Sequence, residues 1–342
     1  MKRLLGKLII LGVLLAGGLA AYGYHWLNSP LALPENGLRQ ELTRGETLSH
    51  LTSELGAQGI LRHPRALRLY ARLTEQTGVH AGEYHLRPGL TTRTLLEQLN
   101  AGEVVLHQVT LIEGWTFAQA LAALHSEDTI VAELKGLSRE QQMARLELDV
   151  AHPEGWFFPD TYRFARGTSD VELLRRAHRI MREELERVWS QRADGLPYET
   201  PYEALIMASL IERETGAPWE REEIAGVFVR RLNRGMRLQT DPTVIYGMGD
   251  RYEGRLTRRD LRAPTPYNTY TNSGLPPTPI ALPGREALAA AVNPAPGTAL
   301  YFVAKGDGTH VFSDTLEAHN KAVREYQLQR REDYRSSLQA AP

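Results

Sequence analysis

The chain has 342 residues and carries 40 Lys and Arg against 41 Asp and Glu, which gives a formal net charge of -1. A nearly neutral chain has no general attraction for a phosphate backbone, so its composition argues against a nucleic-acid-binding protein. The chain contains no cysteine, which excludes a disulfide framework. About 310 residues follow the apolar start of the chain, enough for roughly two domains.

The amino terminus predicts a membrane anchor. Residues 1–7 contain three basic side chains, and residues 8–27 then run without Asp, Glu, Lys or Arg. A run of about 20 apolar residues is long enough to span a bilayer. By the positive-inside rule, residues 1–7 form a cytoplasmic tail, and the chain after about Asn28 lies outside the cytoplasmic (inner) membrane, in the periplasm. A cleaved signal peptide is the alternative.

Residues 38–103 predict a small mixed subdomain. The periodicity indicates helices over 47–55, 64–77 and 91–99 and a strand over 82–86. Its Gly45-Glu46-Thr47-Leu48 segment resembles the opening of a LysM module, a small fold that binds amino-sugar glycans. A generic spacer domain is the alternative. The sequence does not indicate whether such a subdomain binds glycan itself.

Residues 104–335 predict a larger mixed domain, so the fold class is α+β with helices and strands intermixed. A strand is expected over 104–111, helices over 116–124 and 219–234, and a hairpin from strands 300–304 and 309–313. A charged terminal helix follows, which Asp314 and Glu317 can cap. The aromatic, proline-flanked loop 153–162 contains Glu154 and is of the kind that lines a cleft.

One further helix ends in a carboxylate pair. Thr200-Pro201-Tyr202-Glu203 is a capping box with proline at the first helical position, and Gly216 with Pro218 predicts the stop. Residues 204–211 are apolar on almost every side, which is typical of a buried helix. Glu212 follows in the last turn, where burial and the helix dipole would both raise its pKa, as a general acid requires. Its small neighbours at helical spacing suggest an adjacent cleft, and Glu214, about 200° round the helix, should point elsewhere.

Two later segments, 237–247 and 266–277, combine amide, hydroxyl and aromatic groups with Pro and Gly, which we expect to keep them extended. Sugars are bound by such groups, with hydroxyls on amides and apolar faces on aromatic rings. The predicted substrate-binding residues are Gln239, Thr240, Asp241, Tyr246, Tyr267, Asn268, Thr269, Tyr270 and Glu154.

Segments 208–215, 237–247, 267–270 and 274–277 together resemble the signatures of the endolytic murein transglycosylases, the MltG or YceG-like family. The resemblance extends from the apolar start to the terminal helix. It implies an inner-membrane lyase that cuts nascent peptidoglycan strands internally between MurNAc and GlcNAc, leaves 1,6-anhydromuramoyl ends and thereby terminates strand elongation. It also implies Glu212 as the catalytic acid, and a peptidoglycan synthase (penicillin-binding protein) is a possible partner.

A solitary carboxylate suits this chemistry, because an internal hydroxyl replaces the water that ordinary glycosidases activate with a second carboxylate. Asp241 and Glu154 are expected to position substrate or to act electrostatically. Two alternatives stay open: a two-carboxylate peptidoglycan hydrolase using Glu212 with one of them, and a non-catalytic wall-binding scaffold. The eleven histidines form no metal-ligand motif, so we expect neither a metal nor another cofactor.

Overall fold

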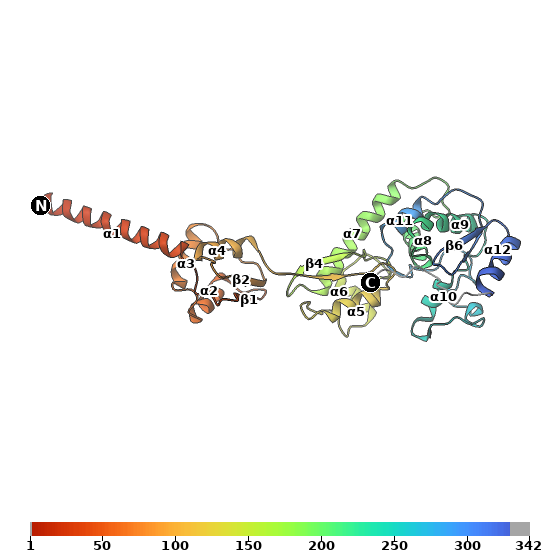
Figure 1. The fold of residues 1–342 in the computed structure, drawn as a ribbon, viewed down its shortest axis with the longest axis horizontal. Helices are drawn as coiled ribbons and strands as arrows, with labels where there is room; N and C mark the ends of the chain where they lie inside the picture. Colours follow the sequence, from red (N-terminus) through yellow and green to blue (C-terminus); the bar gives the residue numbers. More distant parts are fainter. Residues whose placement is uncertain (1, 329–342) are drawn as a thin grey trace. The chain divides into compact units, whose positions relative to one another are not determined.

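The computed structural model describes residues 2–328 (Figure 1). The chain divides into two compact units. The first holds the residues up to Gln108 with Thr129–Val131 and Arg163–Thr168, and the second holds the others. The predicted mixture of helices and short sheets is confirmed. The division into separate domains at 38–103 and 104–335 stays a prediction.

The first unit begins with a long apolar helix, followed by a small sheet and three short helices. Its elements are α1 (Lys2–Asn28), β1 (Leu38–Leu42), α2 (Leu48–Ala57), α3 (Pro64–Leu73), β2 (Gly82–Leu86) and α4 (Thr92–Ala101). Within the described residues, α1 is the one helix long and apolar enough to cross a membrane, over Leu5–Asn28. This is compatible with the predicted single-pass anchor.

Local signals explain the helices of the first unit. The Thr47 hydroxyl accepts the His50 N–H at the start of α2, and Thr91 forms a capping box with Thr94 at the start of α4. β1 and β2 pair antiparallel, and the helices bury leucines around Tyr84 against this sheet. The order is therefore strand, helix, helix, strand, helix, and the likeness to a LysM module stays a prediction.

The second unit is mainly helical. Its elements are α5 (Phe117–Ser126), α6 (Arg139–Leu146), α7 (Asp170–Ser190), α8 (Pro201–Glu214), α9 (Arg221–Asn233), α10 (Asp241–Met248), α11 (Arg285–Val292), β5 (Tyr301–Ala304), β6 (His310–Ser313) and α12 (Leu316–Val323). Short 3-10 turns cover Pro218–Glu220, Gly249–Arg251 and Asp260–Arg262, and Arg324–Leu328 forms a π-helical turn. Two further strands, β3 (Leu106–Thr110) and β4 (Thr161–Ala165), each have residues in both units and pair in a sheet of their own.

Helix α8 is the central element of the second unit. The predicted capping box at Thr200 and Glu203 is confirmed, and every residue from Ala204 to Ile211 is buried. The helix packs on α7, α9 and α11, which form one hydrophobic core with it (Figure 1). Because the body of α8 is enclosed, its polar C-terminal turn is fixed relative to the segments that surround it.

Three local predictions need correction. Helix α3 ends at Leu73 rather than at 77, because Glu75 turns the chain with a positive φ of 57°. Segment 241–248 is the helix α10 rather than extended chain, since Pro242 stands in its first turn, where a missing N–H costs nothing. The cap of α12 is Thr315, whose hydroxyl accepts the Ala318 N–H, rather than Asp314.

The predicted hairpin is confirmed as β5 and β6, in which Tyr301 lies opposite Ser313. The terminal helix is described as far as Leu328, and residues 329–335 of the prediction lie outside the described residues.

Candidate active site

Glu212 lies in the last turn of α8 and accepts hydrogen bonds at both carboxylate oxygens. The Arg221 guanidinium lies 3.2 Å from Oε1, and the Gly284 N–H donates to Oε2 over 2.9 Å. The Glu212 side chain is only 6% exposed. These contacts tie the end of α8 to the start of α9 and to the residue that precedes α11.

Arg221 lies next to three carboxylates. Besides Glu212 it contacts Glu286 and lies 3.8 Å from Glu113. Burial and the neighbouring Glu212 raise the pKa of the Glu113 carboxyl. Glu113 and Arg221 could not be predicted as neighbours of Glu212, because their contacts with it depend on how three separate segments pack. Glu113-Gly114, which follows the predicted strand 104–111, is the one signal in the sequence that indicates a turn at Glu113.

Glu214, two residues further along α8, has different surroundings. The residue as a whole is half-buried, but its carboxyl is buried. This burial raises the pKa of Glu214 to about 7, and the charge of Asp241 acts in the same direction. Arg231 and Arg213 oppose this rise. The Thr240 hydroxyl also lies close enough to lower this pKa, although no described residue makes a hydrogen bond of regular geometry with that hydroxyl.

Asp241 and Tyr270 form a pair beside Glu214. The Tyr270 hydroxyl donates to Asp241 Oδ1 over 2.6 Å, and burial together with the Asp241 and Glu214 charges raises the pKa of Tyr270. Asp241 begins α10, which is why its carboxylate lies next to the turn that precedes this helix. The predicted residues Thr240, Asp241 and Tyr270 are therefore gathered around Glu214.

Other predicted binding residues hold these loops in place. Asn268 is fully buried, and its amide donates to the carbonyls of Asp260, Leu261 and Ala263 while its Oδ1 accepts the Tyr270 N–H. The buried Thr269 hydroxyl accepts the Thr240 N–H over 3.1 Å. The hydrogen bonds of these two side chains are made within the protein and connect these loops.

Gln239 is exposed and has a positive φ of 54°, which a residue with a side chain adopts rarely. Its N–H donates to the Thr269 carbonyl. This strained residue turns the chain immediately before the Thr240-Asp241 pair.

Glu154 lies in a second polar cluster. Its buried carboxylate accepts the Phe117 N–H over 2.8 Å and the Tyr246 hydroxyl over 3.0 Å, and burial raises its pKa to about 7. Tyr246 packs edge-to-face on Tyr267. Because Asp241 and Tyr246 both belong to α10, this helix connects the Glu154 cluster with the Glu214 cluster.

A basic cavity of about 490 Å³ adjoins Tyr270. Its lining residues are Arg237, Arg258, Leu261, Arg262, Tyr270 and Thr271. None of these is acidic, and the three arginines are exposed, so the cavity suits an anionic part of a ligand.

The predicted placement of the cleft beside Glu212 needs correction. Its small neighbours Ala208, Ser209 and Thr215 are buried, and Ser209 accepts the Ile280 N–H inside the core. The prediction that Glu212 and Glu214 have different surroundings is confirmed. Thr240, Asp241 and Tyr270 of the predicted binding segments lie near Glu214. Within residues 2–328, no cluster of three His, Asp or Glu side chains could hold a metal ion, and the absence of any cofactor stays a prediction.

Comparison with known proteins gives consistent matches. Residues 41–325 match the model of the YceG-like family. The chain is 31% identical to an endolytic murein transglycosylase of Bacillus subtilis, over 92% of this chain and 91% of the relative. It is 28% identical to the endolytic murein transglycosylase of Streptococcus pneumoniae, over 93% of this chain and 64% of that protein.

A crystal structure of a YceG-like protein from Listeria monocytogenes is also similar. Its TM-score is 0.51 at 28% identity, and the match covers 84% of this chain and 99% of the Listeria chain.

Proposed function

Because the chain belongs to the YceG-like family, we propose that it is an endolytic murein transglycosylase, a lyase that cuts glycan strands between MurNAc and GlcNAc. The observation that carries the chemistry is the Glu214 carboxyl. Its pKa of about 7 and its position beside Thr240, Asp241 and Tyr270 suit a general acid.

The proposed catalytic acid is Glu214 in place of Glu212. A general acid must hold a proton that it can give to the substrate, and the like charge of Asp241 favours the protonated form of Glu214. Both oxygens of Glu212 instead accept hydrogen bonds from protein donors, which suits a structural carboxylate. That Glu212 is the catalytic acid stays a prediction. The variants described below distinguish it from the proposal of Glu214.

One carboxyl group is sufficient to transfer all protons of this reaction. Protonated Glu214 donates its proton to the glycosidic oxygen, and the bond from that oxygen to the muramoyl C1 breaks. The resulting carboxylate then removes the proton of the muramoyl 6-hydroxyl, whose oxygen bonds to C1. The proton returns to Glu214, and the products are a free GlcNAc hydroxyl and a 1,6-anhydromuramoyl end.

Asp241 supports both steps through its charge. As an anion next to Glu214 it keeps the acid protonated before the reaction, and it stabilises the positive charge that develops at C1. The Tyr270 hydroxyl holds the Asp241 carboxylate in place over 2.6 Å. Glu154 is buried and accepts from the Phe117 N–H and the Tyr246 hydroxyl, so it is assigned to holding Tyr246 and helix α10 in place.

The basic cavity next to Tyr270 provides a subsite for the acidic groups of the strand. The stem peptides of the muramic acid residues carry carboxylates, which Arg258 and Arg262 can bind from the surface.

The proposed location is the cytoplasmic membrane. We assign α1 as a retained single-pass anchor with residues 1–7 in the cytoplasm and the catalytic unit in the periplasm. There the enzyme would act on nascent strands beside a peptidoglycan synthase and terminate their elongation.

Analysis of the products on polymerised, uncrosslinked glycan strands tests this function. We expect internal cutting from the earliest time points and ends that carry the anhydro ring. Reducing muramic ends would indicate the two-carboxylate hydrolase, and release of nothing would indicate the wall-binding scaffold.

The same assay separates the two glutamates. Glu214→Gln keeps the shape of the side chain but removes the catalytic proton, so activity should fall by ~10²–10⁴-fold. Glu212→Gln, the matched control on the same helix turn, should retain far more activity if the protein stays folded, which its thermal unfolding curve checks. The opposite order of losses would assign the acid to Glu212 and overturn the proposed site while leaving the reaction intact.

A further inference from the structure

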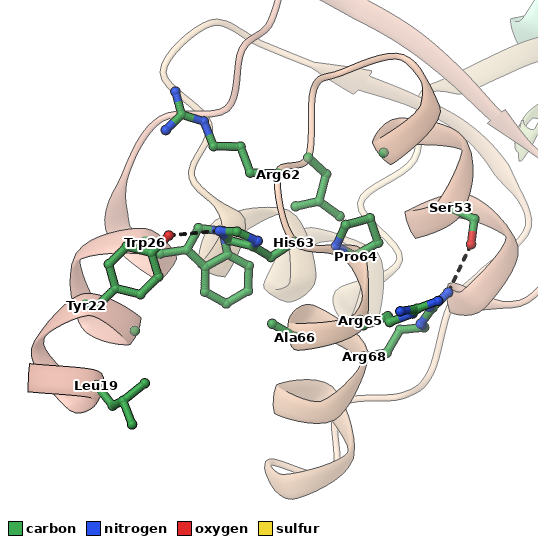
Figure 2. Close-up of a pocket in the computed structure, with 13 residues that line it drawn as sticks. Leu19, Tyr22, Trp26, Ser53, Arg62, His63, Pro64, Arg65, Ala66 and Arg68 are labelled. Carbon is green, nitrogen blue, oxygen red and sulfur yellow. Dashed lines mark hydrogen bonds between the residues drawn. The ribbon is translucent and has the colours of Figure 1, made fainter. Parts of the chain in front are cut away.

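The first unit has a groove where the end of α1 meets the start of α3 (Figure 2). Leu19, Tyr22, Gly23 and Trp26 form one wall, and their spacing places them on a single face of α1. Residues 62–66 form much of the opposite wall, and the volume is about 860 Å³. All residues that line the groove belong to the first unit, whereas the residues of the proposed catalysis belong to the second.

The wall opposite α1 is strongly basic. Arg62 and Arg65 are exposed, and Arg68 is held by hydrogen bonds to the hydroxyls of Ser49 and Ser53. All three arginines line the groove, and Figure 2 shows Arg65 and Arg68 together beside Ser53, with Arg62 extending in another direction. No acidic residue lines the groove, so these charges are not neutralised within it.

Aromatic groups fix the other side. The Tyr22 hydroxyl and His63 Nε2 are 2.9 Å apart, and the Trp26 and His63 rings meet edge-to-face with their centroids 5.7 Å apart. His63 directly precedes α3, so these contacts attach the start of this helix to α1. The groove is therefore a built feature of one unit, with an aromatic side and a cationic side.

The position of the groove along α1 indicates the surroundings in which it works. The apolar span covers Leu5–Asn28, and Tyr22 and Trp26 occupy its final two turns. At 1.5 Å per residue, this part of a spanning helix lies at the level of the lipid headgroups, where Trp and Tyr are enriched.

Helix α3 presents two apolar side chains to the exterior in the same region of the unit. Leu69 is 58% exposed and Leu73 is 76% exposed, on a helix whose other exposed residues include basic side chains. Exposed leucines among arginines are typical of a helix that lies in a membrane interface.

We propose that this groove binds the phosphate headgroup of an anionic phospholipid. The basic wall attracts the phosphate, and an acyl chain runs along Leu19 towards the apolar part of α1. Binding would fix the first unit against the membrane surface. The inference requires that α1 spans the bilayer, but it depends neither on the orientation of α1 nor on the proposed glycan chemistry.

Native mass spectrometry of the full-length protein in detergent micelles tests the proposal. With phosphatidylglycerol or phosphatidylcholine added at equal concentration, we expect one retained phosphatidylglycerol and at least ~5-fold less phosphatidylcholine. Arg62→Gln with Arg65→Gln should weaken phosphatidylglycerol binding by ~10-fold or more, given that each basic side chain contributes about 1 kcal/mol near an anionic surface. Arg68 is left unchanged because it also links α2 and α3.

The matched control is Arg44→Gln with Arg87→Gln, which removes two exposed charges of the same unit outside the groove. It should retain phosphatidylglycerol as the parent does. Equal loss in both double variants, equal retention of the two lipids, or full competition by inorganic phosphate would overturn the lipid site. Glycan cleavage in the same detergent should be unchanged in the Arg62 and Arg65 variant, so a failed lipid site and a failed proposed function give different results.

Discussion

Two glutamates that are two residues apart on one helix end have opposite chemical surroundings. Glu212 accepts from Arg221 and from the Gly284 N–H, whereas Glu214 lies against Asp241 and has a pKa of about 7. The helical period predicts that the two point to different sides. It does not predict which side the later loops will cover, because that depends on how segments 237–248 and 263–272 fold.

The like charge of Asp241 leads to a test by pH. Asp241→Asn removes this charge but keeps an oxygen that can accept the Tyr270 hydroxyl, so the pKa of Glu214 should fall. In the free enzyme the protonated acid would then be lost at lower pH. We expect the alkaline limb of kcat/KM, near pH 7 in the parent, to move to lower pH.

Asp250→Asn is the control for this profile, because Asp250 is an exposed carboxylate of the same region. It should leave the alkaline limb in place. A limb that stays fixed in Asp241→Asn, or that moves to higher pH, would contradict the assignment of Glu214 as the titrating acid.

At the scale of elements, local signals predict structure well where the chain supplies its own cap or turn. The capping box of α8 and the hairpin of β5 and β6 are examples, because their hydrogen bonds join residues close in sequence. Segment 241–248 is helix α10 rather than the expected extended chain, since Asp-Pro begins helices as well as turns. The contacts that complete the site join residues far apart in the chain, which periodicity cannot predict.

The loop that contains Tyr270 depends on Asn268. Asn268→Asp preserves the shape but removes the amide that donates to three carbonyls, and it places a charge in a buried site. We expect a loss of about 3 kcal/mol in the free energy of unfolding and a lower kcat through displacement of Tyr270.

Thermal and denaturant unfolding with parallel kinetics would measure both effects. Asn233→Asp, at an exposed position on α9 with one long 3.5 Å contact, should change neither. An Asn268→Asp variant as stable as the parent would contradict the role given to this side chain.

At the scale of the whole molecule, the proposed topology follows from the charges that flank α1. Three basic residues precede the apolar span, so a reporter fused after Pro342 should be active only outside the cytoplasm. The intact protein should sediment with membranes and resist extraction by high salt. Recovery of a soluble protein that lacks residues 8–27 would point to a cleaved signal instead.

The buried, rotatable hydroxyl of Thr240 has a consequence for the cost of catalysis. It lies near Glu214 but is not committed to a regular hydrogen bond with any described residue. A hydroxyl can accept from a protonated carboxyl and, after rotation about one bond, donate to the ionised form. The site can therefore adjust to both protonation states of its acid by moving a single hydrogen atom, which keeps the reorganisation energy of the proton transfers small.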